Sequence, residues 1–339
     1  MKKSFYSILI FLLFTSQLIA QNSNSKELQQ TAREFMKAGD WDNAILVFSR
    51  AIDSNKFDLQ LQKDLLQCYY YKRDFENALP LIKAIIDNPN ADVPVFQIAG
   101  NVYYALGDVK EGEKLYKTGI KKFPKSGPLY SEYGTLLNEK KDPTAIDFWE
   151  KGIETDPGYS GNYYNAARYY FSTKNSVWAF LYGEIFVNME SLSERGSAIK
   201  ELLLAGYKQK FFLEIDLLRM QGKNKNEFID AFLESMAKQS SIITKGVTVE
   251  TLAMIRSRFI LDWFSTHAEK FPFRLFDYQQ QLLKEGLFDA YNQWLFGITE
   301  NLAAYDKWTK VYSDEHNRFT QFMKNRVFKV PQGQYYQNK

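Results

Sequence analysis

The sequence predicts an all-α protein whose first half is an α-solenoid, a row of stacked antiparallel helix pairs. Three observations support this fold class. Small residues recur about every 34 positions between residues 25 and 193, aromatic residues keep the same phase, and glycine, aspartate or proline interrupts the helical pattern between them. A repeat of this length is typical of stacked helical hairpins, because one hairpin cannot bury its apolar face alone.

The small residues of the second helices set the register of the repeat. They are spaced by 34, 34, 33 and 34 positions at Ala44, Ala78, Gly112, Ala145 and Ala179. Four positions later come Phe48, Ile82, Tyr116, Trp149 and Gly183, and three further on come Ala51, Ile85, Gly119, Gly152 and Phe186. Small residues let two helices approach, and aromatic residues fill the space beside the crossing. We therefore expect a solenoid over 21–193 with units at 25–58, 59–92, 93–126, 127–159 and 160–193.

The third unit shows the repeat most plainly, in the order Phe96, Ala99, Gly100, Tyr103, Gly107, Gly112, Tyr116, Gly119 and Pro124. This order resembles the tetratricopeptide repeat (TPR), and the resemblance covers about half of the chain. It implies a right-handed superhelix whose first helices line a concave face. The alternative is a helical bundle with accidental spacing, which five units in phase over 169 residues disfavour.

Residues 1–20 are expected to be a signal peptide. Lys2 and Lys3 give a positive start, Ile8 to Phe14 is a short apolar run, and Ala20 is a small residue at the expected cleavage point. An uncleaved anchor is the alternative, but a membrane span needs about 20 apolar residues. We therefore expect an exported protein, periplasmic or extracellular in the cell envelope, with no membrane span after signal cleavage.

Charge and cysteine content exclude several classes of protein. Without Lys2 and Lys3, 41 basic residues balance 40 acidic ones, so neither half offers the strongly basic surface that nucleic acid requires. The single cysteine, Cys68, excludes an intramolecular disulfide. With 45% hydrophobic residues, an exported chain of this length can be held by its core alone. The oligomeric state stays open.

The second half of the chain is expected to be helical and rich in aromatic residues. We expect a capping helix and linker at 194–222, a helical region at 223–330 and a disordered polar tail at 331–339. The capping helix would hide the last apolar surface of the solenoid. The aromatic residues of 223–330 have helical spacing, which is usual for a core; a ligand platform is the alternative.

No constellation of residues predicts catalysis. His267 and His316 lie 49 residues apart with no cysteine beside either, which excludes the common zinc spacings. The sequence has no glycine-rich phosphate loop and no Gly-x-Ser-x-Gly motif. We therefore expect a protein that is not an enzyme and that has no metal and no cofactor, with a hydrolase in the C-terminal half as the remaining alternative.

The TPR resemblance implies that the fifth, ninth and twelfth residues of each unit face the concave groove. The candidate peptide-binding residues are Gln29, Arg33, Lys63, Gln67, Tyr70, Gln97, Asn101, Tyr104, Tyr164 and Arg168, and the other groove positions are Met36, Ser131, Thr135, Asn138 and Phe171. The set holds amides, tyrosines and basic groups but no carboxylate. We therefore expect a protein or peptide partner with negative charge or a free carboxyl end. An ordinary solvated surface is the alternative.

The family's clamp for chaperone C-termini is not matched, because the corresponding pairs are Gln29 with Arg33, Lys63 with Gln67, and Gln97 with Asn101. The function we expect is an exported protein–protein interaction scaffold in a cell-envelope assembly. The alternative is a glycan-binding helical-repeat protein of the envelope. The exposure of three tryptophans, at positions 263, 294 and 308, separates the two: buried rings favour the scaffold, and a coplanar exposed pair favours sugar binding.

Overall fold

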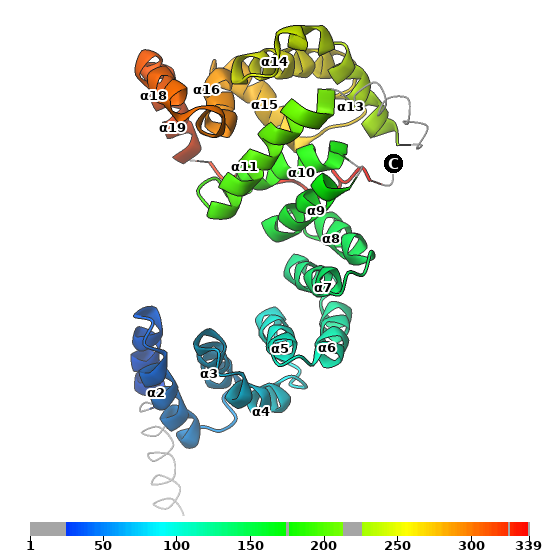
Figure 1. The fold of residues 1–339 in the computed structure, drawn as a ribbon. Helices are drawn as coiled ribbons and strands as arrows, with labels where there is room; N and C mark the ends of the chain where they lie inside the picture. The colour runs from blue at the N-terminus through cyan, green and yellow to red at the C-terminus, as the bar shows by residue number, and fades with distance from the viewer. Residues whose placement is uncertain (1–24, 174–175, 213–225, 325, 338–339) are drawn as a thin grey trace, which may run out of the picture. The chain divides into compact units, whose positions relative to one another are not determined.

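The computed structural model describes residues 25–173, 176–212, 226–324 and 326–337. These residues form helices, turns and extended segments without a β-strand (Figure 1), which confirms the predicted all-α fold class. The chain divides into two compact units, one ending at Pro124 and one beginning at Lys125. The expected signal peptide, residues 1–20, and most of the expected linker before residue 223 lie outside the described residues.

The first unit contains three helix pairs. They are the helix of residues 25–37 with α2 (Trp41–Ser54), α3 (Leu59–Lys72) with α4 (Phe75–Ile85), and α5 (Val93–Ala105) with α6 (Val109–Lys122). Helices α3 and α5 begin at Leu59 and Val93, the residues where the sequence places the second and third repeats. Consecutive helices pack against each other, and α3 also packs against α5, so the first helices of neighbouring pairs adjoin.

A left-handed turn recurs at the end of successive first helices. Four residues spaced by 34 have φ between +58° and +78°: Gly39, Arg73, Gly107 and Lys141. The aspartate after each donates its backbone N–H to the carbonyl five residues earlier, at 2.8–2.9 Å. This bond ends the helix, and in the first three turns the aspartate side chain then caps the next helix. The conformation repeats even where glycine does not.

The small residues of the repeat lie in the core as the spacing predicts. Ala44, Ala78, Ala145 and Ala179 are fully buried, and the aromatic partners Phe48, Tyr116 and Trp149 are at most 3% exposed. The shorter interval of 33 residues, from Gly112 to Ala145, arises after the left-handed turn of the fourth repeat, where α8 begins at Ala145. The small residues of the repeat therefore lie where helices cross, as their spacing predicts.

The second unit begins with two further pairs and continues through the C-terminal half. Its elements are α7 (Gly127–Glu139), α8 (Ala145–Thr155), α9 (Ser160–Ser172), α10 (Ser176–Met189), α11 (Glu194–Gly206), the π-helix η1 (Tyr207–Phe211), α13 (Glu227–Ala237), the 3-10 helix η2 (Ser240–Lys245), α14 (Val249–Thr266), α15 (Arg274–Lys284), α16 (Phe288–Asn292), the π-helix η3 (Gln293–Gly297), α17 (Ile298–Glu300), α18 (Leu302–Val311) and α19 (Ser313–Lys324).

This division differs from the expected domains in two respects. The fourth and fifth pairs lie in the same compact unit as the C-terminal helices, whereas the sequence places them in the solenoid. Helix α11 packs on α10, as a capping helix would, but it also packs on η3 and α17, so further helices lie beyond it. The reason lies in α10, which is buried on almost every side and therefore needs neighbours beyond α9.

A buried polar network connects α10 to the C-terminal helices. Arg256 of α14 forms an ion pair with Glu184 of α10 and also donates to Asn292 of α16. Gln279 and Tyr291 each donate to Glu184 at 2.7 Å. A buried charge is tolerated only when paired and hydrogen-bonded, so this network fixes how α10, α14, α15 and α16 pack together.

The C-terminal strap, which we define as residues 326–337, corrects the expectation of a disordered tail at 331–339. It has no regular secondary structure after α19. Phe328, Val330 and Tyr336 are nonetheless 7%, 7% and 4% exposed. The tail looks disordered in sequence because it is polar, but its few large side chains find apolar partners on distant helices, and burying them offsets the cost of ordering the backbone.

Candidate functional site

The first-helix face of the first unit carries most of the candidate residues. At its start, Gln29 donates to the carboxylate of Asp64 at 3.2 Å, and Arg33 donates to the same carboxylate at 2.8 Å. Gln60 donates to the other oxygen of Asp64 at 2.7 Å. Because Asp64 is only 7% exposed, this cluster fixes the helix of residues 25–37 against α3.

A second ion pair continues the same pattern along the face. Lys63 of α3 pairs with Asp92, the residue that precedes α5. The expectation that this groove contains no carboxylate is therefore wrong. Counting only the fifth, ninth and twelfth residues of each repeat omitted Asp64, at the sixth position, and Asp92, the last residue of the second repeat. Two of the predicted cations in this unit are thus neutralised by carboxylates of adjoining hairpins.

The remaining candidates of the first unit present amides and aromatic rings. Gln67 is half-buried, and its side chain has no hydrogen-bond partner among the described residues. Asn101 accepts a hydrogen bond of 2.7 Å from Tyr116, and the carbonyl of Gln97 lies 3.5 Å from the same hydroxyl. Tyr104 is 44% exposed, and Tyr70, half-buried, packs edge-on against its neighbour Tyr71.

Two candidate residues, Tyr164 and Arg168, lie on α9 of the second unit. The guanidinium of Arg168 lies 5.3 Å from the centre of the Tyr164 ring, and that of Arg195 lies 4.9 Å from it. Arg195 was not predicted, because it belongs to α11 and not to a first helix. Arg168 is exposed, and within the described part of the chain its guanidinium hydrogen-bonds to the Tyr164 hydroxyl alone, at 3.4 Å. It is thus the candidate cation that keeps an accessible charge.

Other groove positions of the second unit serve the fold. Ser131 and Thr135 each accept a hydrogen bond from Asn165, at 3.2 and 3.3 Å. These contacts join α7 to α9, the first helices of neighbouring pairs. Asn138 is exposed, and Phe171 packs against Phe180 with ring centres 5.6 Å apart. The residues at this face therefore divide into those that join hairpins and those that stay accessible.

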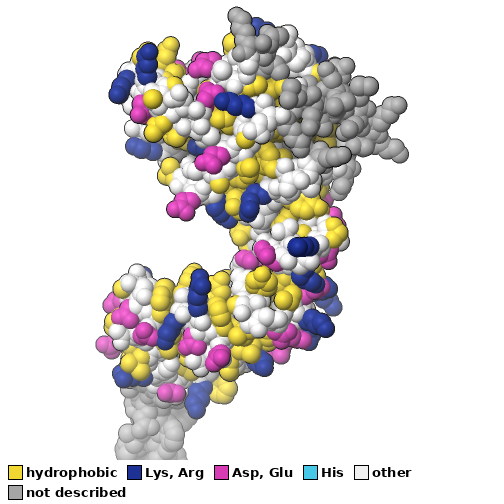
Figure 2. Space-filling view, in the orientation of Figure 1, with side chains coloured by type: hydrophobic (Ala, Val, Ile, Leu, Met, Phe, Trp, Pro, Cys, Tyr) yellow, Lys and Arg dark blue, Asp and Glu magenta, His cyan; other side chains and the backbone are white. Residues whose placement is uncertain are grey.

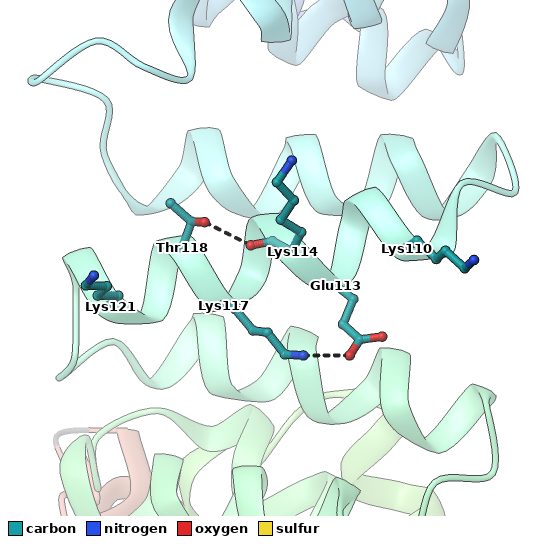
Figure 3. Close-up of a pocket in the computed structure, with 6 residues that line it drawn as sticks. All are labelled: Lys110, Glu113, Lys114, Lys117, Thr118 and Lys121. Carbon is teal, nitrogen blue, oxygen red and sulfur yellow. Dashed lines mark hydrogen bonds and ion pairs between the residues drawn. The ribbon is translucent and has the colours of Figure 1, made fainter.

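Four lysines on α6 line a shallow pocket at the protein surface (Figure 3). Lys110, Lys114, Lys117 and Lys121 follow one face of this helix at helical spacing, and Lys117 pairs with Glu113 at 2.8 Å. All of these side chains come from a single helix and are solvated. On the face shown in Figure 2, basic and acidic side chains are interspersed over the described residues. The lysine row is therefore a solvated helix face and not a constructed anion site.

The three tryptophans argue against a sugar platform. Trp263 is fully buried. Trp294 is half-buried beneath the ammonium of Lys200, which lies 3.7 Å from its ring centre. Trp308 is half-buried and stacks on Tyr312, with ring centres 5.4 Å apart. No two of these tryptophans form a coplanar exposed pair, so the rings favour the scaffold over glycan binding.

Within the described ranges, no group of three histidine, cysteine, aspartate or glutamate side chains is placed to hold a metal ion. No helix in those ranges combines the length and apolar character that crossing a bilayer requires. Cys68 is buried, and burial, with a smaller contribution from Asp64, raises the pKa of its thiol to about 12. A thiol held protonated in this way is a poor nucleophile.

Comparison with known proteins gives structural likeness only. No family model and no curated protein matches the sequence. Solved TPR proteins resemble the fold, among them TTC0263 of Thermus thermophilus, at 14% identity and a TM-score of 0.45 over 53% of this chain and 99% of that one. A TPR protein of Parabacteroides merdae has 17% identity and a TM-score of 0.39 over 82% of this chain and 100% of that one. YrrB, described as a TPR protein with an unusual peptide-binding site, has 15% identity and a TM-score of 0.39 over 56% and 97%.

Proposed function

We propose that this chain, whose helical hairpins resemble those of tetratricopeptide repeat proteins, is a protein-interaction scaffold that binds an extended partner segment along the first-helix face of its first unit. The observation that carries this proposal is the free amide of Gln67, which lies on α3 about one turn after Lys63 and Asp64, the α3 members of two ion pairs. A half-exposed amide without a partner can donate to and accept from a peptide backbone. The pairs Arg33–Asp64 and Lys63–Asp92 hold the surrounding side chains in place before a partner arrives.

The chemistry of this face favours an uncharged extended segment. Because Arg33 and Lys63 already have carboxylate partners, the face offers little net charge in this unit. Tyr104 presents an accessible ring against which an apolar side chain can pack. A partner segment that alternates backbone hydrogen bonds with one apolar side chain fits this arrangement, and its binding should depend only weakly on salt.

Quantitative affinity capture tests the groove. The baits are residues 21–339 of wild type, of a Gln67→Ala/Tyr104→Ala variant, and of a Phe57→Ala control, in which a 95% exposed ring outside the face is removed. We expect proteins recovered with wild type and with the control to be depleted at least about fivefold on the double variant, the loss of roughly one hydrogen bond to a peptide. Equal recovery on all three baits contradicts the groove.

We also propose that the protein is exported and acts in the cell envelope. The sequence of residues 1–20 supports this proposal, with its basic start, short apolar run and small residue at Ala20. Fractionation of producing cells followed by N-terminal sequencing is the test. Export predicts an envelope or secreted species that begins at Gln21, whereas a cytoplasmic species that retains Lys2 contradicts it.

A further inference from the structure

The C-terminal strap contacts the second unit in the way that a bound peptide contacts a receptor. Its side chains alternate between two directions. Gln337 hydrogen-bonds to Glu150 of α8, and Tyr335 lies near the same carboxylate. Tyr336 between them turns toward α13 and the loop before α15. Alternation with a period of two is the geometry of extended backbone. The strap therefore offers separate side chains to two separate subsites.

The first subsite is an aromatic cage for one tyrosine ring. The ring of Tyr336 stacks on Phe228 with centres 4.7 Å apart and planes 6° apart. Phe271 and Phe273 meet the same ring at 5.7 and 6.1 Å. The Tyr336 hydroxyl donates to the carbonyl of Pro272 at 2.7 Å. A cage with an acceptor at its far end selects tyrosine over phenylalanine, because the cage carbonyl would lose its partner.

The second subsite is the buried carboxylate of Glu150. Gln337 donates to it at 2.7 Å, and Tyr170 and Tyr182 donate to it at 2.7 and 2.8 Å. Glu150 is 8% exposed and has no basic residue among these partners. A buried carboxylate without a cation depends on neutral donors. One of its three donors, Gln337, comes from the strap, so the site is incomplete when the strap is absent.

Backbone recognition connects the two subsites. The side-chain amide of Asn226 donates to the carbonyls of Tyr336 and Gln337, at 2.7 and 3.1 Å. Such contacts to main-chain carbonyls hold an extended segment whatever its sequence, while pockets for alternate side chains supply specificity. Near its middle the strap makes an exposed contact, from the Gln332 side chain to the carbonyl of Thr155 at 3.1 Å.

We propose that this surface is a peptide-binding site, occupied in the free protein by its own C-terminal strap, which accepts a partner's extended segment carrying tyrosine followed by a carboxamide residue. The occupant exchanges by displacement of the strap. The site involves α8, α9, α13 and the loop before α15 of the second unit, and none of the residues of the first-helix face. It is therefore independent of the function proposed above, and either can fail without the other.

A peptide of residues 331–337 added to a chain that ends at Val330 tests the site. We expect the shortened chain to bind the fluorescein-labelled peptide with a dissociation constant in the micromolar range. The full chain should bind it at least about tenfold more weakly, because its own strap competes at high effective concentration. A peptide with Tyr336→Ala should lose at least about tenfold in affinity, from loss of the buried ring. A matched peptide with Gln332→Ala should lose less than about threefold, because that contact is exposed.

A folded shortened chain that does not bind the peptide overturns the proposal, as does equal binding of the Tyr336→Ala and wild-type peptides. If the shortened chain does not fold, the full chain with Tyr336→Ala decides. This variant should bind the wild-type peptide at least about tenfold more tightly than wild type does, with Tyr312→Ala, an exposed tyrosine outside the strap, as its control. A variant that is less stable yet binds no peptide shows that the strap is structural only. A dimer formed by exchange of straps between two copies contradicts a foreign occupant.

Discussion

Replacing Gly100 by alanine tests whether the helix crossing that supports the first-helix face is as tight as the structure has it. A β-carbon at this position would lie 2.2 Å from Cζ of Tyr116, and ordinary contact begins at 3.4 Å. The ring therefore has to move by about 1.2 Å, the difference between these two distances. Tyr116 is 1% exposed, and its hydroxyl donates to Asn101 at 2.7 Å, so the ring cannot turn aside without losing that bond.

The expected net effect combines three contributions. Overpacking a core typically costs about 1–3 kcal/mol, and the weakened hydrogen bond from Tyr116 to Asn101 costs about 1 kcal/mol. Alanine in place of glycine within a helix returns about 1 kcal/mol. We therefore expect Gly100→Ala to lower the free energy of unfolding of the first unit by about 1–3 kcal/mol. Without the clash, the same change would stabilise the unit.

Hydrogen–deuterium exchange read from peptides of α5 and α6 measures this effect locally, without assuming that the two units unfold together. Gly183→Ala in α10 is the control, because its β-carbon would come no closer than 3.2 Å to flexible methyl groups of Ile199 and Leu203. Its effect should stay within about 1 kcal/mol of zero. If Gly100→Ala slows exchange in α5 and α6, the packing of Gly100 on Tyr116 is not as described.

Three further predictions concern the second unit. Ala145→Leu should destabilise it by about 1–3 kcal/mol in urea unfolding, because Ala145 is fully buried at a helix crossing; an unchanged midpoint would place Ala145 elsewhere. Burial raises the pKa of Glu150 to about 7 from 4.5, so the folded unit holds a proton that the unfolded chain releases. The free energy of unfolding should therefore fall by on the order of 3 kcal/mol as pH rises through that interval. In the Glu150→Gln variant this fall should be absent when urea midpoints are compared between pH 4.5 and 8. Arg256→Met should lower the free energy of unfolding by about 3–5 kcal/mol, because it leaves Glu184 buried without its cation. Adding Glu184→Leu should recover part of this loss in a double-mutant cycle, and strictly additive losses would contradict the pairing.

The candidate groove shows where reasoning from sequence reached its limit. Counting positions within a repeat places Arg33 and Lys63 on first helices, and that placement depends only on local periodicity. The partner of Arg33, Asp64, belongs to the next repeat, and the partner of Lys63, Asp92, is the N-cap residue of the first helix of the next hairpin. Which carboxylate meets which cation depends on how two hairpins stack, and the spacing within one hairpin does not determine this. The expected charge of the groove was wrong for that reason.

The sequence by itself determined the helical class, the period and the buried small residues, because these follow from interactions within one hairpin. Ala44, Ala78 and Ala145 are buried where the spacing places them. Only the tertiary structure decided which residues far apart in the sequence contact each other. Arg256 meets Glu184 across 72 positions, and Gln337 meets Glu150 across 187. Such pairs leave no periodic signal, since each depends on the packing of helices far apart in the chain, and the same packing orders a tail whose composition alone predicts disorder.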